Sequence, residues 1–270
     1  MLTIAQLIEI ALAGGREVID VYGSEIDATL KSDSSPVTQA DIRCEAVVTE
    51  ALSRMSPDIP VVAEEAAAGG SIPETCEIFY LVDPLDGTKE FINRNGDFTV
   101  NIALIDKGVP VSGIVYAPAL NRLWVGADGE GAFEAEVVDG AAGPLKPIRA
   151  RTAPEAITAV GSRSHGSDAT KVWLERYAVE NLVSRGSSLK FCLVASGEAD
   201  VYPRLGRTME WDTAAGDAVL RAAGGLVTTL DGAPLLYGKR GQSEDVDFAN
   251  PHFVAYGDRA LIGQGAKAPA

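Results

Sequence analysis

The feature that most constrains the fold is a long β-rich stretch between Phe98 and Ala135. It contains apolar runs of strand length, separated by turn residues at the spacing of β-hairpins. The runs are Thr99–Ile105, Val109–Tyr116, Arg122–Gly126 and Ala132–Ala135. Strands joined by such short turns pair antiparallel. The stretch therefore predicts an antiparallel meander, with helices flanking it.

A first amphipathic helix is predicted at the start of the chain. Gln6 and Glu9 interrupt the apolar run there, and no basic residue precedes Arg16, so the segment does not match a signal peptide. Its apolar residues recur at helical spacing, at Ile4, Leu7, Ile8, Ala11, Val18, Ile19 and Tyr22. We expect a cytoplasmic protein that begins with this helix.

A second helix is expected from about Thr38 to Met55. Pro36 precedes it, Thr38 is a favourable N-cap, and Asp41 stands three residues further on, as in a capping box. Short β-rich runs follow at 59–63 and 78–82. Together with the meander, these elements predict an α+β organisation for residues 1–150.

A segment rich in Gly, Ala and Pro, residues 140–154, marks a soft boundary. Beyond it, strand and helix signals alternate, which favours an α/β layer for residues 151–270. The expected strands are 157–161, 200–202 and 226–229, and the expected helices are 167–177, 189–195 and 213–223.

Composition excludes several classes of site. The 270 residues include 23 Lys and Arg against 38 Asp and Glu, a net charge of −15, which argues against binding to polymeric nucleic acid. Three scattered cysteines and two histidines are too few for a disulfide framework or a typical zinc site. A bound metal should therefore be a hard cation held by carboxylates, Mg²⁺ before Zn²⁺. No run approaches the ~20 apolar residues that span a bilayer.

Three groups of acids stand at the expected ends of elements. Asp83 and Asp86 follow a strand, Glu64-Glu65 end another, and Asp212 precedes a helix. Such a set suits a metal centre with oxygen ligands, and the Gly87-Thr88 turn can offer backbone N–H groups to an anion. Each group has a simpler interpretation as well. Asp86-Gly87 is an ordinary turn, Asp212 a helix N-cap, Glu64-Glu65 a solvated edge, and Asp41 a capping residue.

The same acids lie in motifs that resemble the inositol monophosphatase superfamily of metal-dependent, lithium-sensitive phosphatases. Those motifs are Glu64-Glu65, Asp83-Pro84-Leu85-Asp86-Gly87-Thr88 and Trp211-Asp212-Thr213-Ala214-Ala215-Gly216. Further blocks are similar to its bacterial CysQ branch of 3′(2′),5′-bisphosphate nucleotidases. They are 35–41, 89–92, 96–105, 162–165 and 186–192, so that the resemblance covers nearly the whole chain.

The resemblance implies the layered αβαβα sandwich of this superfamily and a site with two or three Mg²⁺, or Mn²⁺. Its metal ligands would be Glu64, Asp83, the backbone carbonyl of Leu85, Asp86 and Asp212, with Asp83 bridging two ions. Two such ions would activate the attacking water and stabilise the leaving 3′-oxygen.

The resemblance also implies which residues orient the attacking water, hold the phosphate and contact the nucleotide. Asp41 and Thr88 would orient the attacking water, and the N–H groups of Gly87 and Thr88 would hold the phosphate. Nucleotide contacts would come from His165, Ser187, Ser188, Lys190 and Arg204.

The implied reaction is hydrolysis of adenosine 3′,5′-bisphosphate to AMP and phosphate in sulfur assimilation, with 3′-phosphoadenylyl sulfate as a second substrate. Two alternatives stay open: a phosphatase of the same fold acting on inositol or sugar phosphates, and a catalytically weak nucleotide-binding protein. The sequence leaves open the oligomeric state, the metal used in vivo and peripheral contact with the inner membrane.

Overall fold

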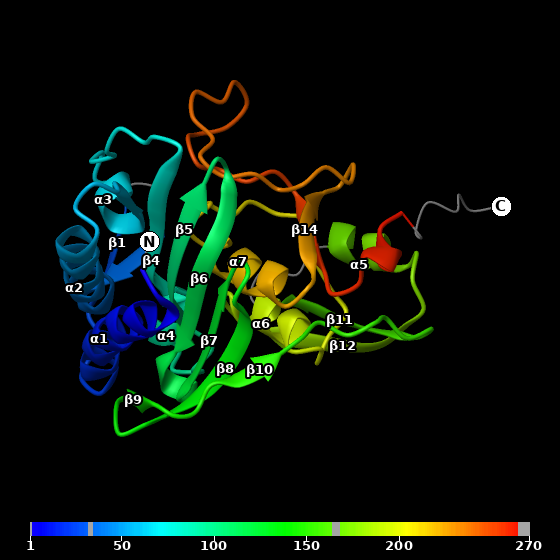
Figure 1. Cartoon of the computed structure of the whole chain (residues 1–270), viewed down its shortest axis with the longest axis horizontal. Helices are drawn as coiled ribbons and strands as arrows, with labels where there is room; N and C mark the ends of the chain where they lie inside the picture. Colours follow the sequence, from blue (N-terminus) through cyan, green and yellow to red (C-terminus); the bar gives the residue numbers. More distant parts are fainter. Residues whose placement is uncertain (1, 32–34, 164–167, 264–270) are drawn as a thin grey trace.

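Five layers of helices and sheets follow one another across the molecule in the computed structural model, which describes residues 2–31, 35–163 and 168–263 (Figure 1). The outer helices are α1 (Ile4–Tyr22) and α2 (Gln39–Met55). A large sheet comes next, then α6 (Leu189–Ala195) and α7 (Ala214–Ala222), then a smaller sheet, with α5 (Asp168–Leu174) on its far side. This is the αβαβα sandwich that the resemblance implies.

The large sheet contains the predicted meander. Its strands run in the order β10-β8-β7-β6-β5-β4-β3, with β9 pairing β8. Their bounds are β3 Val61–Ala63, β4 Ile78–Asp86, β5 Thr99–Asp106, β6 Val109–Ala117, β7 Arg122–Ala127, β8 Gly131–Val138, β9 Ala141–Ala142 and β10 Lys146–Ile148. Only β3 and β4 pair in parallel. The hairpin spacing in the sequence thus predicts β5 to β8 correctly.

The smaller sheet has the order β12-β11-β13-β15-β14. Its strands are β11 Ile157–Ser162, β12 Val179–Arg185, β13 Val201–Arg204, β14 Leu226–Thr229 and β15 Phe253–Tyr256. Strands β12, β11 and β13 are parallel, and the remaining pairs are antiparallel. The short elements outside both sheets are β1 Ala28–Leu30, β2 Pro36–Thr38, α3 Glu64–Ala68, α4 Thr88–Ile92 and the 3₁₀ turns η1 Pro118–Leu120 and η2 Arg259–Leu261.

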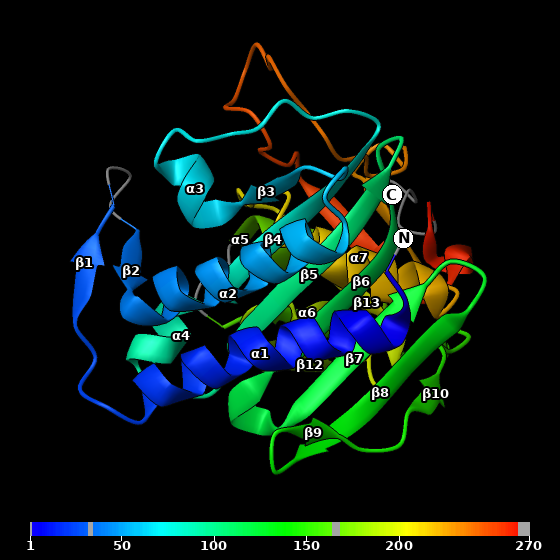
Figure 2. The same cartoon turned by 60° about the vertical axis from the view of Figure 1, so that its left-hand side comes forward.

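Both predicted N-terminal helices are confirmed, and they lie side by side across one face of the large sheet (Figure 2). The side chain of Thr3 caps α1 in a capping box with Gln6. Thr38 caps α2 in a second box with Asp41. The apolar stripe of each helix is buried against the sheet.

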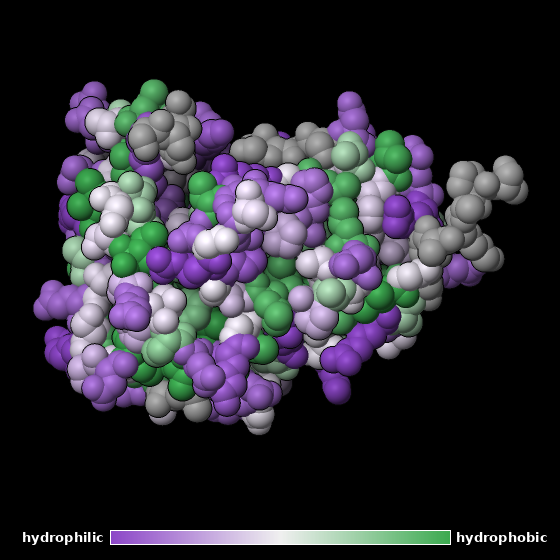
Figure 3. Space-filling model, turned by 90° about the horizontal axis from the view of Figure 1, so that it is seen from above, coloured by the Kyte–Doolittle hydropathy of each residue, from purple (hydrophilic) through white to green (hydrophobic). Residues whose placement is uncertain are grey.

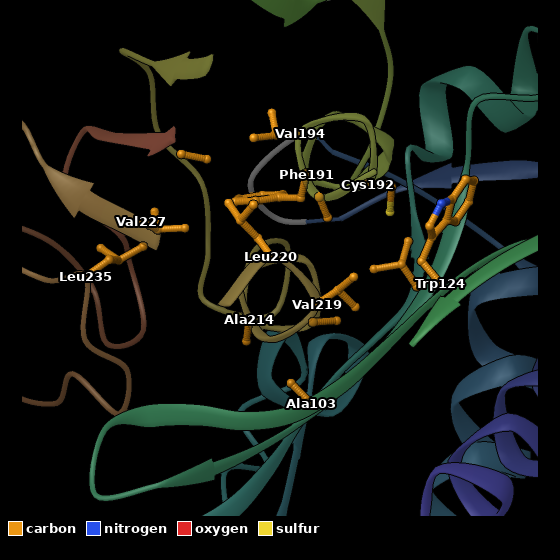
Figure 4. Close-up of a cluster of buried hydrophobic side chains, with 14 of the residues drawn as sticks. Ala103, Trp124, Phe191, Cys192, Val194, Ala214, Val219, Leu220, Val227 and Leu235 are labelled. Carbon is orange, nitrogen blue, oxygen red and sulfur yellow. The ribbon is translucent and has the colours of Figure 1, made fainter. Parts of the chain in front are cut away.

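A second core fills the space between the two sheets. In Figure 4, Phe191 of α6 and Leu220 of α7 point into this space, together with Val227 of β14. Trp124 of the large sheet closes the cluster from the other side. Because residues of α6 and α7 share one core with the large sheet, the elements that carry Lys190 and Asp212 are fixed relative to β4 and β5.

Several predicted boundaries are wrong in detail. The strand expected at 59–63 begins at Val61, and Glu64 begins helix α3 instead of ending a strand. Strands β12 and β15 were not predicted, and α5 ends at Leu174, three residues before the predicted end. Among the described residues, no helix is long and apolar enough to cross a membrane.

Candidate active site

A cavity of about 750 Å³ opens between α3, the β4–α4 turn, the start of α6 and β13. The predicted site residues that line it are Glu64, Asp86, Gly87, Thr88, Ser187, Lys190, Arg204 and Asp212. Asp83 and Asp41 are almost completely buried beneath its floor. The face that Figure 3 shows is mixed in character, with hydrophilic side chains grouped near its centre.

The end of β4 and the turn into α4 contain five of the predicted residues. Asp83, Leu85 and Asp86 lie within β4, which runs on past the predicted end at residue 82, so the two acids do not follow the strand as predicted. The β4–β5 register shifts between Asp83 and Asp86, so the strand end is irregular, and Leu85 N donates to Asp83 Oδ1 at 3.0 Å. Gly87 then adopts a φ of +93°, where a side chain would be strained, and caps α4. A Cβ there would also lie 3.0 Å from the carbonyl oxygen of Asp97. The chain can turn from Asp86 into Thr88 because residue 87 is glycine.

Asp41 both caps a helix and contacts Thr88. Its Oδ2 accepts hydrogen bonds from the Thr38 backbone N–H and hydroxyl, each at 2.7 Å. Its Oδ1 faces the Thr88 hydroxyl at 3.3 Å, and that hydroxyl can instead donate to the Leu85 carbonyl at 3.2 Å. Burial raises the pKa of Asp41 to about 6, although the bonds from Thr38 oppose the shift. The two interpretations of Asp41 are therefore compatible, because each uses a different oxygen.

Glu64 and Glu65 begin α3, and both contact a lysine that sequence reasoning missed. Lys31 Nζ lies 2.7 Å from Glu64 Oε1 and 2.6 Å from Glu65 Oε1. Burial opposes the charge of Lys31, but the two carboxylates outweigh it and raise the lysine pKa. Burial likewise raises the pKa of Glu65 to about 7. Glu45 of α2 completes the arrangement by accepting from the backbone N–H groups of Glu65 and Ala66 at 2.7 and 2.8 Å.

The acidic residues act on one another electrostatically. Burial raises the pKa of Asp83 well above its usual range, and the charges of Glu64, Asp86 and Asp212 add to the effect. Burial and the charges of Asp86 and Glu64 raise the pKa of Asp212 in the same way. A divalent cation would relieve this repulsion, since it favours the ionised form of each carboxylate.

The donor set fits a hard cation, although the described residues contain no group of three acidic, His or Cys side chains already arranged as a metal cage. Each carboxylate has its own partner instead. Glu64 pairs with Lys31, Asp86 accepts from two serines, and Asp212 Oδ2 accepts from Met209 N at 2.8 Å. All the donors are oxygens, which Mg²⁺ prefers to nitrogen or sulfur.

The serines belong to the turn before α6. The Ser187 and Ser188 hydroxyls lie 2.8 and 3.0 Å from Asp86 Oδ2. Ser188 Oγ also lies 2.7 Å from the carbonyl oxygen of Asp212. The pair therefore connects two acids that stand 126 positions apart, since 212 − 86 = 126.

The cavity is also lined by basic residues, among them Lys190 and Arg204. We call the metal-ligand carboxylates the acidic end of the site, and Lys190 and Arg204 its basic end. Lys190 is only 5% exposed, donates to the Ser187 carbonyl and lies 5.3 Å from the centre of the Tyr202 ring. Burial lowers its pKa to about 8, although the charge of Asp86 favours protonation. Arg204, at the end of β13, donates to the Arg207 carbonyl at 3.0 Å. Its buried Nε has no hydrogen-bond partner among the described residues.

His165 lies outside the described residues, so its predicted contact has no structural counterpart here. The missed residues, Lys31 and Glu45, left no local signal because their partners are 33 and 20 positions away. A lone lysine after a short strand and a glutamate inside a helix both look like solvated side chains in the sequence.

Comparisons with known proteins show to which family the chain belongs. The model of the inositol monophosphatase family matches residues 2–251. The 3′(2′),5′-bisphosphate nucleotidase CysQ of Escherichia coli K12 is 44% identical over 250 residues, which cover 92% of this chain and 97% of that protein. The nucleotidase of the same name from Buchnera aphidicola is 40% identical over 252 residues, 93% of this chain and 92% of that one.

Solved structures show the same fold. The crystal structure of CysQ from Bacteroides thetaiotaomicron, described as a bacterial member of the inositol monophosphatase family, superposes with a TM-score of 0.77 at 35% identity. It covers 95% of this chain and 97% of that one. An inositol monophosphatase from Anabaena gives a TM-score of 0.74 at 26% identity, over 97% and 93% of the two chains.

Proposed function

Because the chain belongs to the inositol monophosphatase family, we propose that it is a metal-dependent 3′(2′),5′-bisphosphate nucleotidase. Its reaction is hydrolysis of the 3′-phosphate of adenosine 3′,5′-bisphosphate, which gives AMP and phosphate. The relatives named above, at 40 to 44% identity over more than nine-tenths of the chain, support this activity.

One observation supports the bisphosphate over simpler substrates, namely that the two ends of a single cavity carry opposite charge. A monophosphate of inositol or of a sugar needs only the acidic end, where metal ions neutralise the phosphate. Buried Lys190 and partly buried Arg204 line the same cavity and present positive charge that a second phosphate can use. A substrate with phosphates on two positions of one ribose fits both ends.

The proposed metal ligands are Glu64, Asp83, the Leu85 carbonyl, Asp86 and Asp212. Bound there, Mg²⁺ or Mn²⁺ would act as a Lewis acid toward the attacking water and the leaving oxygen. In this proposal Asp41 takes a proton from a water held at the Thr88 hydroxyl. Two observations support the role: Asp41 Oδ1 lies 3.3 Å from that hydroxyl, and a pKa of about 6 leaves Asp41 ionised near neutral pH yet more basic than an ordinary aspartate. The Thr88 hydroxyl can turn between Asp41 and the Leu85 carbonyl, so it can accept from or donate to that water.

We assign the second phosphate to Lys190 and Arg204, with Ser187, Ser188 and His165 contributing further contacts to the nucleotide. The proposal includes 3′-phosphoadenylyl sulfate as a second substrate and a role in sulfur assimilation. It also divides the chain into residues 1–150, with most metal ligands, and 151–270, with the nucleotide contacts. A cytoplasmic location, peripheral membrane contact and the oligomeric state stay predictions.

The test is phosphate release from a panel of adenosine 3′,5′-bisphosphate, inositol monophosphate and fructose 1,6-bisphosphate, each with Mg²⁺. We expect the adenosine bisphosphate to have the highest kcat/KM and exhaustive chelation to abolish release. Preference for an inositol or sugar phosphate would replace the proposed substrate. Release that survives chelation would contradict the metal-dependent mechanism.

A further inference from the structure

Three polar side chains near the start of β5 contact three consecutive residues of the turn before α6. The hydrogen bonds join Gly186 N to Asp97 Oδ2 at 2.9 Å, the Thr99 hydroxyl to the Ser187 hydroxyl, and Asn101 Nδ2 to Ser188 Oγ at 3.0 Å. Alternate residues of a strand point to the same face, so Thr99 and Asn101 of β5 face the turn together, and Asp97, two residues before the strand, continues the series. We call these three residues the β5 ladder.

The turn that the ladder holds touches both ends of the cavity. Its serines contact Asp86 of the acidic end at 2.8 and 3.0 Å. The Ser187 carbonyl accepts from Nζ of Lys190, the buried cation of the other end. The position of this turn therefore sets the distance between the two ends.

The turn also depends on β5 for its own conformation. Ser187 has a φ of +53°, in the left-handed region that serine seldom adopts. Gly186 packs so closely that a Cβ would lie 2.8 Å from the carbonyl oxygen of Asp97. A backbone of this kind persists only where neighbouring groups fix it, and the ladder supplies those groups.

We propose that the β5 ladder determines substrate specificity by fixing the separation between the two phosphate-binding ends. Asp97, Thr99 and Asn101 are at most 4% exposed and do not line the cavity, so they are positioning residues. A loosened turn would leave the acidic end able to act on a single phosphate and would misplace Lys190 for the second. The proposal rests on the proposed function, since it concerns a substrate with two phosphates.

The experiment compares adenosine 3′,5′-bisphosphate with adenosine 3′-monophosphate, which differ only in the 5′-phosphate. Thr99→Val removes one hydroxyl at nearly constant volume. Asn101→Leu removes the donor to Ser188, and also a 3.5 Å contact from Asn101 Nδ2 to Asp86 Oδ2, so Thr99→Val is the cleaner of the two variants. The Asn101 oxygen that is lost with the donor is buried and lacks a hydrogen-bond partner among the described residues. We expect each variant to lower the ratio of kcat/KM values, bisphosphate over monophosphate, by about three- to tenfold. Most of the change should be in KM for the bisphosphate, and Thr99→Ser should restore the ratio.

Two further variants separate positioning from a general loss of stability. Ile102→Val, at a buried position on the other face of β5, should lower the melting temperature while leaving the ratio unchanged. In Lys190→Ala, which lacks the cation, adding Thr99→Val should lower the ratio by less than twofold, because the ladder acts through that cation.

Equal losses on both substrates, or an unchanged ratio in Thr99→Val and Asn101→Leu, would overturn the ladder proposal. The proposal would be overturned as well if Ile102→Val lowered the ratio as much as Thr99→Val does. A wild-type ratio near one has a separate meaning. It would contradict the proposed function itself, and the ladder proposal would fall with it.

Discussion

The two ends of the cavity contain buried charges of opposite sign, and they are stabilised in different ways. At the acidic end, several groups hold the carboxylates, such as Lys31 for Glu64, the serines for Asp86 and the Met209 N–H for Asp212. At the basic end, Lys190 is held by one carbonyl and one aromatic ring, and burial lowers its pKa to about 8. The carboxylates of the acidic end, whose pKa values burial and mutual repulsion raise, therefore gain most from a bound cation, whereas Lys190 is close to losing its charge.

This difference separates chemistry from selection. A cation-binding acidic end is a requirement for cleaving any phosphate ester by this mechanism. The basic end adds nothing to bond cleavage and acts only on substrates that carry a second anionic group. Substitutions at the two ends should consequently have effects that differ in kind as well as in size.

Asp83→Asn should have the largest effect. It removes the most buried carboxylate of the acidic end, and we expect turnover on every substrate to fall on the order of 10²- to 10³-fold or more. The melting temperature without metal should stay near that of the wild type or rise, because repulsion with Glu64, Asp86 and Asp212 is relieved. Phosphate release and thermal unfolding in chelator test both parts. Retained turnover would remove Asp83 from the mechanism.

Glu64 and Glu65 form a matched pair for the next comparison. Both contact Lys31. Of the two, Glu64 is among the main charges that raise the pKa of Asp83, and Glu65 is not. We expect Glu64→Gln to lower kcat/KM by about a hundredfold, comparable to the loss of one charge-stabilising group. Glu65→Gln should cost no more than about threefold, since a carboxyl with a pKa of about 7 is already half protonated at neutral pH. Losses of equal size would show that the lysine contact, and not the position of Glu64, is what matters.

Lys190→Ala tests the basic end. Charge-assisted hydrogen bonds contribute ~1.5–3 kcal/mol, so kcat/KM for adenosine 3′,5′-bisphosphate should fall about ten- to a hundredfold. Adenosine 3′-monophosphate should be affected by less than about threefold. An equal loss on both would mean that Lys190 supports the fold or the acidic end. The same measurement on Arg204→Ala asks whether the two cations act together.

The last effect is expected from pH, and its size can at most equal that of Lys190→Ala. Lys190 in the free enzyme is charged below its pKa of about 8 and loses its charge as the pH rises through that value. The ratio of kcat/KM values, bisphosphate over monophosphate, should therefore fall above pH 8 and level off at the ratio of Lys190→Ala. In Lys190→Arg the guanidinium stays charged, and the fall should disappear. A fall that persists in the arginine variant would have to come from another group.

The sequence predicts elements well where one local signal dominates. Thr38 caps α2 and Leu189–Ala195 forms α6 as expected, because caps and helical periodicity depend on residues within a few positions. Strand β12 was missed because it lies at the edge of the sheet with most of its residues exposed, so apolar and polar residues do not alternate along it. Strand β15 was missed because it is buried on both faces, so it lacks the alternation of polar and apolar residues that marks a half-buried strand.

The candidate site could be predicted in its residues but not in its connections. Family motifs identify the acids, yet nothing local pairs Lys31 with Glu64 or places Gly186 against Asp97. One signal was available and unused. Thr99 and Asn101 are polar at alternate positions at the start of a strand that is otherwise apolar there, and Asp97 precedes them at the same spacing; such a pattern indicates that one face meets polar groups.

Asp41 has a consequence for comparing related chains. Its Oδ2 accepts hydrogen bonds from the Thr38 backbone N–H and hydroxyl and so forms part of the capping box of α2, whatever the reaction. A descendant that had lost its activity would still be selected to keep an aspartate at this position, because losing it would unravel the first turn of the helix. An aspartate here is therefore weak evidence of a working enzyme. The hydroxyl of Thr88 does not cap α2. Its replacement should therefore be the earlier sign, in a related chain, that activity has been lost.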